Sequence, residues 1–256
     1  MLCRLAAEES AYLSEHFRLL DKIGDEEKIL LSQLKEPVFP QNYLKRLHEE
    51  LETESRIAAV SQLMKRLGYL LVVPTLYTAA VYNKALNLDF TEAYLVDRRQ
   101  GNLWMPHLWW EELTASELSG ESRHARIEEL ARKLVEELAE IIRAISKAAS
   151  IPRSILWENT AIYVYWLYET RLMLEEDNRI RLKAKGDFEF LLKELPAEAF
   201  NEKVNQFQKF HHPRNVDPES GEAIRVRQTC CFAYETGGGK AYCKTCPKKV
   251  RPCVVK

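Results

Sequence analysis

The stretch RHARIEELARKLVEELAEIIRAISKAAS, residues 123–150, decides the fold class of this 256-residue chain. Its apolar residues recur at spacings of three and four, and charged residues fill the opposite face. This periodicity is typical of an amphipathic α-helix that lies with one face on an apolar core. The apolar positions are Ile127, Leu130, Leu134, Leu138, Ile141, Ile145 and Ala148. We therefore expect a long helix that ends near Ser150.

Helical patterns extend on both sides of this stretch. Residues 152–177 are apolar and aromatic on most faces, which is typical of a helix at the centre of a protein. Residues 4–22 and 25–35 suit two short amphipathic helices. A longer apolar pattern covers residues 40–86 and predicts a helix with a kink at Pro74.

Residues 91–110 differ from the helical stretches. β-type residues flank the sequence RRQGN at 98–102, and this arrangement predicts a β-hairpin. Near the C-terminus, residues 223–228 alternate like a strand. The sequence therefore predicts an α+β fold that is predominantly α. We expect a helical body with a hairpin over residues 1–220 and a small cysteine-rich module over residues 221–256.

Composition limits the class of protein. A hydrophobic content of 46% is enough for a core without disulfides, and a net charge of −1 argues against a nucleic-acid partner. The N-terminus lacks the apolar segment of a signal peptide, and the longest apolar stretch, 69–82, is too short to span a bilayer. We therefore expect a soluble, cytoplasmic protein, and leave open a peripheral contact with the inner face of the cell membrane.

Four of the six cysteines lie in TCCFAYETGGGKAYCKTCP, residues 229–247. Cys230 and Cys231 are adjacent, and Cys243 and Cys246 form a C-x-x-C pair. Such clustering in a reducing compartment favours a metal or redox site over disulfides. Four thiolates suit a tetrahedral zinc ion or a [2Fe–2S] cluster, and a redox dithiol is a third alternative. Adjacent cysteines on extended backbone point to opposite sides, so they reach one centre only where the chain bends.

This stretch resembles the C-terminal motif of the FhuF-like ferric-siderophore reductases. The shared pattern is R-x-T-C-C-F-x-Y, a glycine-rich loop and Y-C-K-T-C-P. In that family two adjacent cysteines and a C-x-x-C pair bind a [2Fe–2S] cluster. The resemblance implies Cys230, Cys231, Cys243 and Cys246 as cluster ligands, with Cys253 as the competing thiol. The loop between the pairs, residues 232–242, is one residue longer here than in the family.

The resemblance also implies an activity. An iron–sulfur oxidoreductase of this kind reduces siderophore-bound Fe(III) to Fe(II) by one electron in the cytoplasm and so releases the iron. No G-x-G-x-x-G motif follows a strand in this chain, so we expect an external electron-donor protein. The alternative is a non-catalytic helical domain that binds a siderophore or a protein, with a structural zinc ion on the four cysteines.

Basic residues gather near the cysteines. Residues 240–256 contain six basic side chains and no acidic one, which suits an anionic ferric chelate; the alternative is a basic tail that keeps the terminus solvated. The hairpin adds arginines and exposed tryptophans that suit the same kind of ligand; the alternative is that this loop is the lid of the helical core. The predicted substrate-binding residues are Arg225, Arg227, Lys240, Lys244, Arg98, Arg99 and Trp104.

Other conspicuous side chains have a plainer explanation. Core packing accounts best for Trp157, Tyr163, Tyr165 and Trp166, because their spacing covers all faces of one helix. Glu158 and Asn159 interrupt that helix, and we expect them to form structural hydrogen bonds. Histidine ligands from His211 and His212 are not needed where four cysteines are available.

Overall fold

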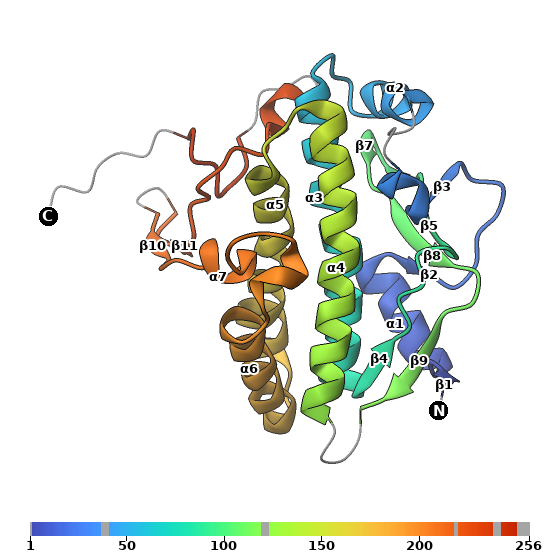
Figure 1. Ribbon diagram of the computed structural model, residues 1–256, viewed down its shortest axis with the longest axis vertical. Helices are drawn as coiled ribbons and strands as arrows, with labels where there is room; N and C mark the ends of the chain where they lie inside the picture. Colours follow the sequence, from blue (N-terminus) through green and yellow to red (C-terminus); the bar gives the residue numbers. More distant parts are fainter. Residues whose placement is uncertain (1, 37–40, 119–122, 218–219, 238–241, 250–256) are drawn as a thin grey trace, which may run out of the picture.

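The computed structural model of this protein describes residues 2–36, 41–118, 123–217, 220–237 and 242–249. Helices dominate, and several small β-sheets accompany them, so the predicted α+β, predominantly α class is confirmed (Figure 1).

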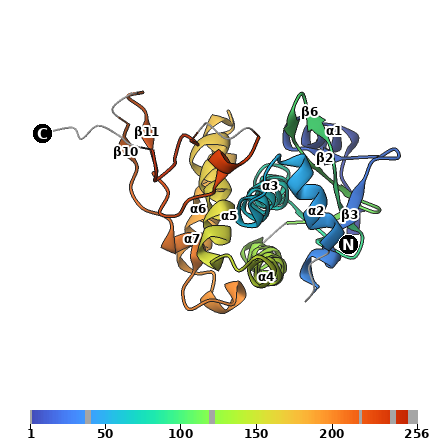
Figure 2. The same ribbon diagram turned by 90° about the horizontal axis from the view of Figure 1, so that it is seen from above.

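Three long helices form the centre of the molecule (Figures 1 and 2). They are α3 (Arg56–Tyr77), α4 (Arg123–Ala149) and α5 (Arg153–Trp166). The predicted helix over residues 123–150 is therefore confirmed as α4. A π-helical turn extends α3 over Thr78–Tyr82, and two short turns extend α5 over Leu167–Arg171 and Leu172–Leu174.

Helices α3 and α5 run in the same direction. Asn159 donates to the Ser61 carbonyl near their N-terminal ends, and Tyr77 donates to Glu175 beyond the end of α5. Their axes come close at Gly68, where an added Cβ would lie 3.0 Å from the Cα of Thr160. A larger side chain at position 68 would force the two helices apart. This pair of helices is the scaffold for the C-terminal cysteines.

The sheets built from the strands before α4, together with α1 (Ala7–Phe17), lie on one side of α3, and the C-terminal segment lies beside α5 (Figure 2). One sheet has the order β1-β9-β4 and another the order β2-β8-β5-β3, in which only β2 and β8 run parallel. The strands are β1 (Leu2–Arg4), β2 (Leu19–Leu20), β3 (Lys28–Leu30), β4 (Lys84–Leu86), β5 (Ala93–Val96), β8 (His107–Trp110) and β9 (Thr114–Glu117).

The predicted hairpin over residues 91–110 is confirmed. Strands β5 and β8 pair antiparallel, with Leu95 opposite Leu108. The tip is a second short ladder of β6 (Arg99–Gln100) and β7 (Leu103–Trp104), closed by Gly101 at a φ of 57°. A positive φ suits glycine because it carries no Cβ.

The remaining elements complete the fold. They are α2 (Gln41–Glu50), α6 (Asn178–Lys193), α7 (Gln206–Lys209), β10 (Asn215–Val216), β11 (Ala223–Ile224) and 3₁₀ turns over Leu31–Lys35, Ala197–Phe200 and Ala233–Glu235. The apolar pattern of the sequence does not predict α6, and the predicted strand over 223–228 is limited to β11.

The predicted helix over residues 25–35 is wrong. Residues 28–30 form a strand instead, because Ile29 pairs with Leu95 in the sheet, and only a 3₁₀ turn follows. Pairing with a distant strand here outweighs a short local pattern.

The single helix predicted over residues 40–86 is also wrong. It divides into α2 and α3, because Glu52 adopts a left-handed conformation and the Ser55 side chain accepts from Ala58 N as the N-cap of α3. Its last residues form β4. The first helix is shorter than predicted, since Arg18 turns left-handed after Phe17.

In the described part of the chain, one helix is long and apolar enough to cross a membrane by length and composition. It spans Arg56–Tyr82, and 78% of its most apolar window is buried inside the protein. Such burial is typical of the central helix of a soluble protein.

Candidate metal centre

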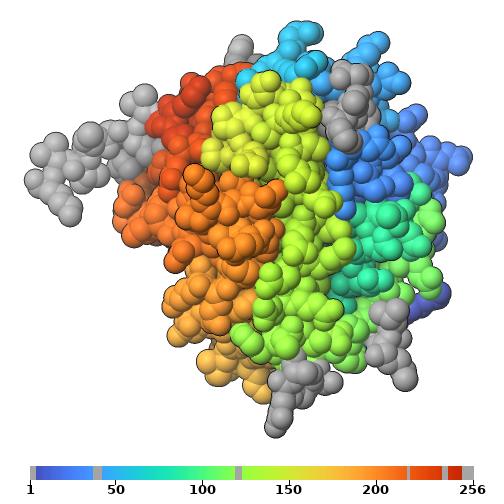
Figure 3. All heavy atoms as spheres, viewed as in Figure 1, coloured from blue at the N-terminus to red at the C-terminus, as the bar shows by residue number. Residues whose placement is uncertain are grey.

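The four clustered cysteines lie on two short segments beside α3 and α5. Cys231 and Cys246 are each 2% exposed, whereas Cys230 and Cys243 are half-buried. In the space-filling view the C-terminal segment packs against the residues where α4 passes into α5 (Figure 3). The cysteine region therefore packs on the helical body. The competing thiol, Cys253, lies outside the described residues.

The chain bends sharply after the adjacent cysteines. Phe232 has a φ of 56°, and a 3₁₀ turn over Ala233–Glu235 follows at once. This bend brings the Phe232 amide to donate to Cys230 Sγ at 3.4 Å. It also brings Cys231 Sγ to 3.8 Å from Cys243 Sγ. The bend that adjacent cysteine ligands need is present.

The C-x-x-C pair forms a tight turn of its own. The amide of Cys246 donates to the carbonyl of Cys243 at 3.0 Å. Thr245, inside that turn, accepts a 2.9 Å hydrogen bond from the backbone amide of Arg227. The two cysteine segments are thus joined by backbone as well as by the neighbouring sulfurs.

Polar side chains of the central helices hold the first cysteine pair. From α3, Ser61 and Gln62 both donate to the backbone carbonyl of Cys231, at 3.0 and 2.6 Å. From α5, the Glu158 carboxylate accepts from the amides of Gln228 and Thr229, each at 2.7 Å. Buried polar groups need such partners, so these bonds fix where residues 228–231 lie. Sequence reasoning missed Ser61 and Gln62, whose signal was two polar residues inside an apolar helix.

A buried arginine completes this network. Arg227 is 4% exposed and donates from Nη2 to Asn159 Oδ1 at 2.6 Å, while its Nε lies 3.5 Å from Glu158 Oε2. Asn159 in turn donates to Ser61 Oγ at 2.9 Å, and Ser61 contacts Cys231. The expected structural role of Glu158 and Asn159 is confirmed.

The electrostatic environment favours a thiolate at Cys231. A hydrogen bond with Cys243 lowers the pKa of Cys231 to about 4 against the opposing effect of burial, and the positive charges of Lys65 and Arg227 add to this. The same hydrogen bond and burial raise the pKa of Cys243. Burial also raises the pKa of Cys230. The thiolate is the form of cysteine that binds metals.

The sulfur geometry fits one metal atom of a two-iron centre. Two thiolates on a tetrahedral metal with metal–sulfur bonds of about 2.3 Å lie about 3.8 Å apart. Cys231 and Cys243 have this separation, and together with Cys230 and Cys246 they supply the sulfur donors that a [2Fe–2S] cluster requires. Among the described residues, no three cysteine, histidine or acidic side chains converge closely enough for one metal ion.

The predicted substrate-binding residues fall into two groups. Arg225, Arg227 and Lys244 line a pocket next to the cysteine segments, where Arg225 pairs with Glu169 and Lys244 with Glu222. Lys240 lies outside the described residues.

The hairpin residues lie elsewhere, on the far side of α3 from α5 (Figure 2). Arg98 forms an ion pair with Glu26, and Arg99 with Glu50. The prediction of an exposed, ligand-facing Trp104 is wrong. Its ring is 2% exposed because the indole packs under Arg66 and its Nε1 donates to Asp97 at 3.0 Å.

The aromatic residues of α5 divide between core and pocket. Trp157 is 1% exposed and packs edge-on against Phe200, so its predicted core role is confirmed. Tyr165 is buried as well, but one side of it borders the pocket. Tyr163 and Trp166 also line the pocket, and Trp166 is 37% exposed.

No protein-family model matches this chain, and no curated protein matches it either.

Proposed function

We propose that this protein is a ferric-siderophore reductase that carries a [2Fe–2S] cluster on Cys230, Cys231, Cys243 and Cys246. The observation that carries the proposal is the 3.8 Å separation of Cys231 Sγ and Cys243 Sγ, one from each cysteine pair. This spacing suits two ligands of one metal atom, and Cys230 and Cys246 would supply the remaining thiolates. The C-terminal motif shared with the FhuF-like reductases supports the same assignment.

The residues around the cysteines suit a one-electron site. A bound cluster would supply one-electron transfer at a potential set by charge and hydrogen bonding. The Phe232 amide donates to Cys230 Sγ, and the positive charges of Lys65 and Arg227 act on Cys231 and Cys243. Amide donors and nearby cations both stabilise added negative charge, so they favour the reduced form. The hydrogen bonds to Cys231 and to residues 228 and 229 hold the site in place.

In this proposal Fe(III) is the substrate. One electron converts Fe(III) in the siderophore to Fe(II), which oxygen donors hold less tightly, and the iron is then released to other ligands. The electron comes from an external one-electron carrier protein. We assign the reaction to the cytoplasm, with a peripheral membrane contact as a further proposal.

The cofactor is tested on protein purified without oxygen. We expect two iron atoms and two labile sulfides per chain, a reddish-brown colour that bleaches with dithionite, and an EPR signal from the reduced protein. Serine variants at Cys230, Cys231, Cys243 and Cys246 should each alter or abolish that signal, while Cys253→Ser should leave it unchanged. A colourless protein that contains stoichiometric zinc would replace this proposal with the zinc-stabilised binding domain.

The activity needs a separate measurement. Protein reduced with dithionite and then desalted is mixed with a ferric siderophore in the presence of a chromogenic Fe(II) chelator. We expect one Fe(II) released per reduced protein, together with return of the oxidised spectrum. A reduced protein that transfers no electron to hydroxamate, catecholate or hydroxycarboxylate chelates would refute the reductase and leave the cofactor assignment standing.

A further inference from the structure

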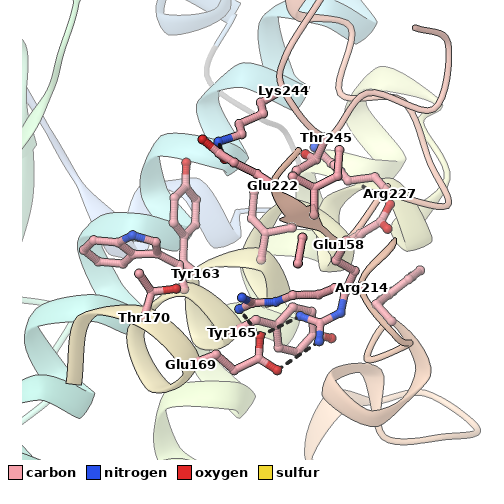
Figure 4. A pocket seen from close by; sticks show the side chains of 16 residues that line it. Glu158, Tyr163, Tyr165, Glu169, Thr170, Arg214, Glu222, Arg227, Lys244 and Thr245 are labelled. Carbon is pink, nitrogen blue, oxygen red and sulfur yellow. Dashed lines mark hydrogen bonds and ion pairs between the residues drawn. The ribbon is translucent and has the colours of Figure 1, made fainter. Parts of the chain in front are cut away.

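A pocket of about 490 Å³ lies between α5 and the C-terminal segment (Figure 4). This volume is within the range of pockets that bind small molecules. Tyr163, Tyr165, Trp166 and Phe210 supply aromatic walls. Among its described lining residues, four cationic side chains stand against three carboxylates, which leaves one positive charge in excess. The pocket therefore combines an aromatic surface with a bias toward anions.

Arg227 gives this pocket an unsatisfied donor. Its Nη1 is buried and forms no hydrogen bond with any described residue, whereas Nη2 donates to Asn159 and Nε lies 3.5 Å from Glu158 Oε2. A buried N–H group without an acceptor is unfavourable, and an anionic oxygen is the strongest acceptor for it. In Figure 4 Arg227 lies beside Glu158 and Thr245, on the opposite side of the view from Tyr163. The side chain thus forms one wall of the pocket.

The pocket also adjoins the cysteine sulfurs. Lys244 and Thr245, which lie between Cys243 and Cys246 in sequence, are part of its lining. Arg227 contacts Thr245 through its backbone amide, and its charge acts on both Cys231 and Cys243. A molecule in the pocket would therefore sit against the same turn that carries two of the proposed ligands.

We propose that this pocket binds the ferric substrate, and that the substrate is an anionic chelate bearing carboxylate oxygens. The inference rests on the proposed reductase function. Arg227 anchors the carboxylate, and the aromatic walls contact the carbon skeleton. One electron passes from the reduced protein to the Fe(III) of the bound chelate and gives Fe(II); no covalent bond of the chelate breaks in that step. The oxidised protein is then reduced again by an external iron–sulfur or flavin carrier.

Binding is tested apart from electron transfer with gallium(III) citrate, which is anionic and is not reduced under these conditions. Its affinity for the cofactor-loaded protein is measured by titration calorimetry. Arg227→Gln should weaken binding at least tenfold. Thr170→Trp should do the same, because Thr170 is an exposed lining residue and a large ring there fills the pocket without touching the buried network. Arg143→Gln, which removes an exposed cation of α4, serves as the charge-matched control and should bind like the wild type.

The ligand class is tested with a neutral gallium(III) trihydroxamate, which should bind at least tenfold more weakly than the citrate complex. Equal binding of the two chelates would contradict the proposal that the ligand is an anionic chelate. The assignment of this pocket as the binding site would be contradicted if the wild-type protein does not bind gallium citrate. It would also be contradicted if the Thr170→Trp protein binds gallium citrate normally.

These outcomes separate the pocket from the reductase. Thr170→Trp protein that reduces ferric citrate as fast as the wild type shows that the reductase is right and the pocket wrong. Protein that binds gallium citrate in the pocket but reduces no ferric chelate shows that the pocket is right and the reductase wrong.

Discussion

Gln62 on α3 donates a 2.6 Å hydrogen bond to the backbone carbonyl of Cys231, a residue 169 positions further along the chain. Ser61 donates to the same carbonyl, so two neighbouring side chains of the central helix hold the first cysteine pair. The cysteine region is in this way attached to α3, a helix that is largely buried. Substitutions in α3 should therefore affect the position of the cysteines.

The first prediction concerns this attachment. Gln62→Ala removes one of the two donors to Cys231 and should lower the free energy of unfolding by about 1 to 3 kcal/mol. If the protein carries the proposed cluster, this variant should also lose its iron more readily to a chelator, because residues 230 and 231 are less firmly held. The measurements are urea unfolding and the rate of metal loss. Gln208→Ala is the control, since the Gln208 side chain is exposed. Equal metal loss from the two variants would contradict the prediction.

The second prediction concerns the buried acid–base pair. Glu158 and Arg227 have side chains that are each 2% exposed, and the Glu158 carboxylate also accepts from the amides of Gln228 and Thr229. Glu158→Gln leaves Arg227 as a buried charge and places an amide donor against backbone donors. Breaking one side of a buried pair costs about 3 to 5 kcal/mol. Chemical unfolding should show a loss of this size.

The matched control is Glu189→Gln, which changes an exposed carboxylate of α6 and should alter the unfolding free energy by less than about 0.5 kcal/mol. A Glu158→Gln protein as stable as this control would show that Arg227 does not depend on Glu158.

The third prediction concerns the helix contact at Gly68. An added Cβ would lie 3.0 Å from Thr160 Cα, so Gly68→Ala should push α3 away from α5 and destabilise the protein by about 1 to 3 kcal/mol. Gly186 offers a matched control in helix α6, because an added Cβ there meets nothing within 4 Å. Gly186→Ala should instead stabilise the protein by about 0.5 to 1 kcal/mol. Thermal and urea unfolding of the two variants would show opposite shifts, and shifts of the same sign would contradict the close approach.

The fourth prediction is a pH dependence. Burial raises the pKa of Glu169, but hydrogen bonds from Arg225, His211 and Arg214 outweigh it and lower the pKa from its ordinary 4.5 to about 2. Because the folded pKa lies below the unfolded one, the unfolded chain takes up the proton first as the pH falls. The stabilisation is therefore present above pH 4.5 and is lost progressively toward pH 2.

Urea unfolding at pH 5 and at pH 3 measures this effect. The wild type should lose more stability between these two values than Glu169→Gln, which has no proton to take up at that position. Glu194→Gln, at an exposed site, should follow the wild type. Equal losses in the wild type and Glu169→Gln would show that the three donors do not act on this carboxylate.

Apolar periodicity predicted well those elements whose buried face is determined by their own sequence. The spacing from Ile127 to Ala148 predicted α4, and the Arg98–Asn102 turn predicted the hairpin. It failed where a distant partner decides the local structure. Residues 28–30 form a strand because they pair with residues 94–96, and no local pattern contains that information.

The sequence by itself determined the helical class and the clustering of four cysteines near the C-terminus, because apolar periodicity and C-x-x-C spacing are local properties. Only the tertiary structure decided that Cys231 meets Cys243, that Ser61 and Gln62 hold that cysteine, and that Trp104 is core while Arg227 lines a pocket. Those relationships join residues far apart in the chain. They arise when α3 and α5 pack together and the buried polar groups of both helices must find partners.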